Sequence, residues 1–147
     1  MTKRLIIKDL IPELYQTMLQ LSEFVAESGI NKLHQELIKI RASQINGCAF
    51  CMSKHTVEAL KYGEDPKRLY ILSAWKEATD YFSAEEQVIL KLTEEITLIA
   101  DYGLSNRTYD EAVRLFGEEM TAKLIVAIVN INALNRFSVS QRLHPLT

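Results

Sequence analysis

Apolar residues recur every three or four positions along most of the chain, which is the spacing of one face of an α-helix. No run of alternating β-branched residues, the pattern typical of a strand, competes with this periodicity. Start and stop signals divide the pattern into about seven segments. We expect helices over residues 12–28, 31–45, 48–63, from 65–66 onward, 83–103, 108–117 and 118–136. The sequence therefore predicts an all-α fold, a single helical bundle domain over residues 1–147.

Short polar residues and glycines mark these boundaries. Asn31 is a good N-cap, and Asp65 is followed by a proline suited to a first helical position. Ser83 opens a capping box, S-A-E-E, and Thr108 opens a second match, T-Y-D-E. All five glycines fall at expected helix ends, and Gly117 is expected to separate the last two helices.

The last expected helix contains the stretch KLIVAIVNINALNRF, residues 123–137, which is apolar on nearly every side. Such a helix lies either at the centre of a fold or in a subunit interface. The polar residues within it need hydrogen-bond partners where they are buried, either between helices and subunits or around a pocket. They are Asn130, Asn132, Asn135 and Arg136. The apolar character of this helix predicts a homo-oligomer.

Composition narrows the class of protein. The chain of 147 residues has the length of one typical domain, and 48% hydrophobic with 24% charged residues is a globular composition. A net charge of −2 provides no basic footprint for nucleic acid or an anionic membrane. The N-terminus has no signal-peptide pattern, and the longest apolar run, residues 124–129, is too short for a bilayer. We therefore expect a cytoplasmic protein with no nucleic-acid or membrane partner.

Both cysteines lie in the segment INGCAFCMSKH, residues 45–55. Cys48 and Cys51 are three positions apart and His55 follows four later, so the three side chains share one face of a helix. Gly47 permits a turn that places Cys48 near the helix N-cap, where unpaired N–H groups and the helix dipole favour a thiolate. Cysteines at this spacing are also within reach of a disulfide. The segment is typical of a pair that cycles between dithiol and disulfide.

A carboxylate in the preceding helix completes this pattern. If the two helices are antiparallel around Gly47, Glu36 lies level with His55 and reaches it more readily than it reaches Cys48. Glu36 alone would be read as a solvated helix residue. Beside the cysteine stripe, it indicates a carboxylate that holds a histidine, which in turn takes a proton from a thiol.

The stretch from Glu36 to His55 resembles the AhpD-like alkylhydroperoxidase family, within the wider carboxymuconolactone decarboxylase superfamily. The family pattern is a glutamate, a CxxC twelve residues later, and a histidine four past the second cysteine, and this chain matches it without a gap. The resemblance extends over roughly residues 10–140, through Trp75, YFSAEEQVILKLTEEIT and IVNINALNRF.

The resemblance implies an all-helical trimer or hexamer that reduces organic hydroperoxides with no cofactor and no bound metal. It implies that Cys51 attacks the peroxide and Cys48 resolves the product to a disulfide. His55 would be the base, and Glu36 would orient it. The position of His55 also favours Cys51, although the helix dipole alone would favour Cys48. Relatives draw electrons from a lipoyl-bearing partner, so we expect a dithiol or lipoyl-type protein reductant.

One residue departs from the family pattern. Phe50 stands where the best-known members carry a second histidine, so it cannot join a proton relay. It either lines an apolar pocket or packs in the core.

Three other interpretations stay open at this point. Glu36, Cys48, Cys51 and His55 are all ligand types that Zn²⁺ accepts. The superfamily also contains cofactor-free decarboxylases that act on a lactone, although that chemistry leaves the cysteines unexplained. The third interpretation is a non-catalytic, redox-sensing oligomer. Consumption of hydroperoxide with the loss of two thiols would distinguish a peroxidase from the last two.

Overall fold

The computed structural model describes residues 4–145, and within this range all regular structure is helical. The predicted all-α fold is confirmed. The elements are α1 (Ile7–Leu10), α2 (Pro12–Glu27), α3 (Lys32–Asn46), α4 (Ala49–Lys61), α5 (Pro66–Ile71), the 3₁₀ turns η1 (Leu72–Glu77) and η2 (Thr79–Tyr81), α6 (Ala84–Thr97), α7 (Ile99–Tyr102) and α8 (Asn106–Gln141).

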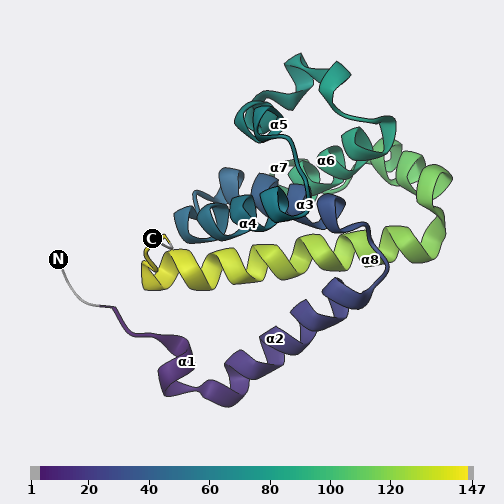
Figure 1. The fold of residues 1–147 in the computed structure, drawn as a ribbon. Helices are drawn as coiled ribbons and strands as arrows, with labels where there is room; N and C mark the ends of the chain where they lie inside the picture. Colours follow the sequence, from purple (N-terminus) through teal and green to yellow (C-terminus); the bar gives the residue numbers. More distant parts are fainter. Residues whose placement is uncertain (1–3, 146–147) are drawn as a thin grey trace.

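The long helix α8 is the centre of the arrangement, since it packs against α2, α3, α4 and α6. In Figure 1, α3 and α4 lie along one side of α8 and α2 lies along the other. This central position accounts for the apolar character of residues 123–137. Within the described range, no helix is long and apolar enough to cross a membrane.

Two clusters of buried side chains form the core. The larger joins α3, α6 and α8 through residues such as Ile38, Ile89 and Ile128, each at most 1% exposed. The smaller surrounds Trp75 and Leu72 of η1 with residues of α3, α4 and α6. Because burial of one such side chain contributes roughly 1.5–3 kcal/mol, these clusters fix the helices that carry the cysteine and glutamate residues.

Several predicted boundaries are confirmed. Asn31 and Asp65 accept backbone hydrogen bonds as N-caps, and both bonds of the Ser83 capping box are present. Gly117 has a φ of 78°, and α8 bends sharply there, at the boundary expected between the last two helices. Beyond the bend, α8 continues to Gln141 and not only to residue 136, and the four-residue α1 was not predicted.

The capping box predicted at Thr108 is wrong, because Ser105 is the N-cap of α8 and accepts from the Thr108 N–H. Glu95 favours Ser105 over Thr108 as the N-cap. Its carboxylate accepts from the Ser105 N–H at 2.8 Å and from Thr108 Oγ1 at 2.7 Å. The same contacts explain why the helix predicted to reach residue 103 ends at Thr97. A straight helix would carry the chain about 12 Å away from Glu95 over eight residues, whereas Ser105 has to return to it.

Candidate active site

The turn between α3 and α4 positions both cysteines. Gly47 has a φ of 65°, a left-handed conformation that favours glycine, and Cys48 follows as the N-cap of α4. The Cys48 sulfur accepts from the backbone N–H of Cys51 at 3.4 Å. Both residues are free thiols, and they are buried, at 1% and 4% exposed. The predicted placement of Cys48 at the helix start and Cys51 in the first turn is therefore present.

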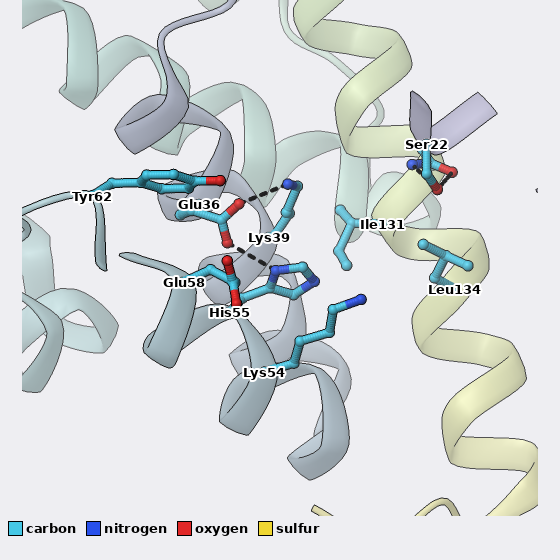
Figure 2. Close-up of a pocket in the computed structure, with 10 residues that line it drawn as sticks. Ser22, Glu36, Lys39, Lys54, His55, Glu58, Tyr62, Ile131 and Leu134 are labelled. Carbon is cyan, nitrogen blue, oxygen red and sulfur yellow. Dashed lines mark hydrogen bonds and ion pairs between the residues drawn. The ribbon is translucent and has the colours of Figure 1, made fainter. Parts of the chain in front are cut away.

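The predicted contact between Glu36 and His55 is also present. Glu36 Oε2 lies 2.8 Å from His55 Nδ1, and Lys39 Nζ lies 2.7 Å from the other carboxylate oxygen (Figure 2). Burial raises the pKa of Glu36, but the hydrogen bond with His55 and the charge of Lys39 outweigh it, so the pKa is lowered overall. The buried carboxylate is thus ionised at neutral pH and fixes the orientation of the imidazole.

The two thiols have opposite electrostatic environments. A hydrogen bond from Cys48 is the largest of the effects that lower the pKa of Cys51 to about 6, against the opposing effect of burial. Ser138, Asn135 and the charge of His55 add to this lowering. The same hydrogen bond, together with burial, raises the pKa of Cys48. The thiolate therefore forms at Cys51, and Cys48 remains the thiol that donates to it.

Ser138 and Asn135 of α8 are site residues that the sequence interpretation did not assign. Ser138 Oγ lies 3.7 Å from Cys51 Sγ. Asn135 is fully buried, donates to Ser43 Oγ at 3.0 Å and accepts from Asn46 Nδ2 at 3.0 Å, which ties α8 to α3. An asparagine inside an apolar helix was a signal for such a role, whereas Ser138 gave none.

A cavity of about 120 Å³ has Cys51 in its wall. Phe50 lines it together with Leu134 and Phe137, so this phenylalanine faces a pocket, one of its two expected placements. A second cavity, of about 230 Å³, lies beside it and is lined by residues that include Glu36 and His55 (Figure 2).

The geometry does not support the four-ligand zinc site. Within residues 4–145, no three His, Cys, Asp or Glu side chains converge as metal ligands. Both oxygens of Glu36 are engaged, one by His55 and one by Lys39.

Comparison with known proteins identifies the family of the chain. Residues 12–95 match the model of the carboxymuconolactone decarboxylase family. The chain belongs to this family. It is 39% identical over 140 residues to the uncharacterized protein YdfG of Bacillus subtilis (strain 168), covering 95% of both chains.

Two solved structures of similar fold belong to proteins with different names. A protein of unknown function from Agrobacterium tumefaciens, named as a candidate AhpD antioxidant defence protein, superposes with a TM-score of 0.94 at 30% identity over 99% of both chains. A variant of the debrominase Bmp8 in complex with 2,3,4-tribromopyrrole gives a TM-score of 0.82 at 17% identity, covering 95% of this chain and 74% of that one. The second likeness concerns the fold alone.

Proposed function

We propose that this member of the carboxymuconolactone decarboxylase family is a thiol peroxidase that reduces organic hydroperoxides with Cys51 and Cys48. The observation that carries the proposal is the buried pair of free thiols at the start of α4, in which the pKa of Cys51 is lowered and that of Cys48 is raised. Thiolates, and not thiols, attack peroxides. The name of the Agrobacterium structure agrees with this activity.

In the first step, the Cys51 thiolate attacks the terminal oxygen of the hydroperoxide. The S–O bond forms, the O–O bond breaks, and the alkoxide leaves as an alcohol after taking a proton. In the second step, the Cys48 sulfur attacks the sulfenic acid of Cys51, the S–S bond forms, and hydroxide leaves as water with the Cys48 proton. The peroxide gains two electrons and the two thiols lose two.

His55 moves the proton of the first step. Its Nδ1 is bonded to Glu36, and in Figure 2 its other ring nitrogen is directed into the cleft toward α8. The imidazole accepts the proton of the Cys51 thiol and returns it to the departing alkoxide. Glu36 acts through His55 and is a positioning residue.

Turnover needs a reductant that returns two electrons to the disulfide. The proposed partner is a dithiol or lipoyl-type protein, because thiol–disulfide exchange reopens the Cys48–Cys51 bond without other chemistry. The reaction is proposed for the cytoplasm, where such dithiols are kept reduced.

The test is a single-turnover reaction of the reduced protein with cumene hydroperoxide. We expect one alcohol formed and two thiols lost per chain, with a mass decrease of two hydrogens in the intact protein. Peroxide that survives in the presence of intact thiols would contradict the proposal. Activity toward a carboxylated lactone with both cysteines replaced would support the decarboxylase interpretation instead.

A further inference from the structure

The two cavities beside the cysteine pair are parts of one cleft. Residues of α2, α4 and α8 line both of them, and they are Ser22, Lys54, His55, Ile131 and Leu134. The end near Cys51 is mainly apolar, with Phe50 and Phe137 in its wall. The other end carries the charged side chains of Glu36, Lys39 and Glu58. A substrate whose peroxide group reaches Cys51 therefore extends its remaining groups past the shared residues.

Charges along this cleft are paired, with one exception. Lys39 is bound to Glu36 at 2.7 Å, and Glu58 is bound to Lys61 at 2.8 Å. Lys54 lies between the two ends, lines both cavities and is exposed. Within residues 4–145, its ammonium has neither a carboxylate nor a hydrogen-bond partner. Figure 2 shows its side chain extending from α4 across the cleft toward α8.

The position of Lys54 on α4 relates it directly to the reacting sulfur. It follows Cys51 by three residues, so the two side chains emerge on the same helix face with Cβ atoms about 5–6 Å apart. The lysine stem carries its charge beyond the sulfur, toward the part of a substrate that does not react. The groups that stabilise the Cys51 thiolate are Cys48, Ser138, Asn135 and His55, so the charge of Lys54 is available for a ligand.

We propose that Lys54 binds a carboxylate on the substrate, and that the preferred substrates are organic hydroperoxides with an apolar body and one carboxylate. This inference rests on the proposed peroxidase function. A single ammonium matches a monoanion, because it is a compact point charge with three donors. The carboxylate of Glu58 on the same cleft would repel a more highly charged group such as a phosphate.

The kinetic test compares two peroxides that differ only in charge. They are cumene hydroperoxide with a para-carboxylate and the methyl ester of that compound, each reacted with the reduced full-length protein. We expect the wild type to lose its thiols about tenfold faster with the carboxylate, the effect of roughly one charge-assisted hydrogen bond. In Lys54→Met the carboxylate-to-ester rate ratio should fall to about one, and Lys54→Arg should restore most of it. Lys67→Met, which removes an exposed lysine of α5 that lines neither cavity, should keep the wild-type ratio.

A binding test separates this inference from the peroxidase proposal. The probes are 4-isopropylbenzoate and the corresponding neutral amide, titrated into the reduced protein with NMR detection. We expect the benzoate to bind about tenfold more tightly than the amide in the wild type and equally in Lys54→Met. Charge-dependent binding without any peroxide reaction would contradict the peroxidase function and leave the anion site supported. Peroxide reduction with the same carboxylate preference in wild type and Lys54→Met would overturn the role of Lys54.

Discussion

Ser138 Oγ lies 3.7 Å from the sulfur of Cys51, although the two residues are 87 positions apart in the chain. The contact places the Cys51 thiol between the start of α4 and the side of α8. Asn135, one helical turn before Ser138, is held to α3 by Ser43 and Asn46. The environment of Cys51 therefore depends on how three helices pack, and not only on the CxxC segment.

The first prediction concerns the two cysteines separately. Cys51→Ser should abolish peroxide reduction, because Cys51 is the thiol with the lowered pKa. Cys48→Ser should still form one sulfenic acid at Cys51 but should not turn over, because no thiol remains to resolve it. Labelling with a sulfenic-acid reagent followed by peptide mass spectrometry measures both. A label on Cys48 in the Cys51→Ser protein, with Cys51 inert in the other variant, would reverse the two roles.

The second prediction concerns the proton relay. His55→Ala should slow thiol oxidation by roughly 10²–10⁴-fold, as the loss of a general base does, and Glu36→Gln should slow it less. Glu36 acts by holding Nδ1 of His55 at 2.8 Å, so its loss should also change the pH profile. Stopped-flow measurement of thiol loss at several pH values gives both quantities. Glu111→Gln is the matched control, because it removes a carboxylate paired with Lys91 outside the cleft. An equal effect of Glu36→Gln and Glu111→Gln would remove Glu36 from the relay.

The sequence indicated the local part of the site because helical spacing determines it. Cys48, Cys51 and His55 lie on one face wherever that segment is helical, and the turn at Gly47 brings Glu36 level with His55. Ser138 could not be found this way, because no local pattern specifies which side of α8 meets α4.

The helix boundaries at Thr97 and Ser105 were predicted wrongly for the same reason. Ser105 and Thr108 both begin an acceptable cap pattern, and the choice between them depends on Glu95 of another helix. The break after Thr97 follows from the same contact.

The third prediction is that the protein is a homo-oligomer, a trimer or a hexamer. The first two helices expose several large apolar side chains, among them Leu10 at 65%, Leu14 at 48% and Phe24 at 54%. Val129 and Val139 of α8 are also exposed. Such surface is typical of an interface between subunits. Sedimentation at micromolar concentration should give a multiple of the 16.8 kDa chain mass, and a monomeric mass would contradict the prediction.

The fourth prediction concerns stability away from the cleft. Glu94 is 8% exposed and accepts from Trp75 Nε1 at 2.7 Å and from Arg41 Nε at 2.9 Å, which joins α6 to η1 and α3. Glu94→Leu should lower the free energy of unfolding by about 3 kcal/mol or more, because the Arg41 charge loses its buried partner. Chemical denaturation measures this difference, and Glu77→Leu, at an exposed position nearby, should change it little.

The pKa of Glu94 gives this contribution a pH dependence. Burial raises that pKa, but hydrogen bonds from Lys76, Trp75 and Arg41 lower it overall. A depressed folded-state pKa contributes stability above the unfolded value of 4.5, and this stability is lost as the pH falls through the folded pKa. The difference between wild type and Glu94→Leu should therefore shrink in acid. A difference that stays constant down to pH 2 would contradict the assignment.

The last prediction returns to the hydroxyl beside Cys51. Because thiolate is the attacking form, the rate of thiol oxidation in the wild type should rise with pH around a midpoint of about 6 and level off above it. Ser138→Ala removes a hydrogen bond that lowers the pKa of Cys51, so the midpoint should move upward. A hydrogen bond to a charged group is worth about 1.5 kcal/mol or more, which corresponds to roughly one pH unit.

The shift has a signature that a loss of packing would not give. Near pH 6 the Ser138→Ala protein should react several-fold more slowly than wild type, whereas at pH 9, where Cys51 is ionised in both proteins, the two rates should converge. Ser140→Ala is the control, because it removes an exposed hydroxyl of the same helix two residues further on and should leave the midpoint unchanged. Stopped-flow oxidation by cumene hydroperoxide from pH 4.5 to 9 measures all three proteins. A uniform reduction of the Ser138→Ala rate at every pH would mean that Ser138 supports the packing of α8 and does not stabilise the thiolate.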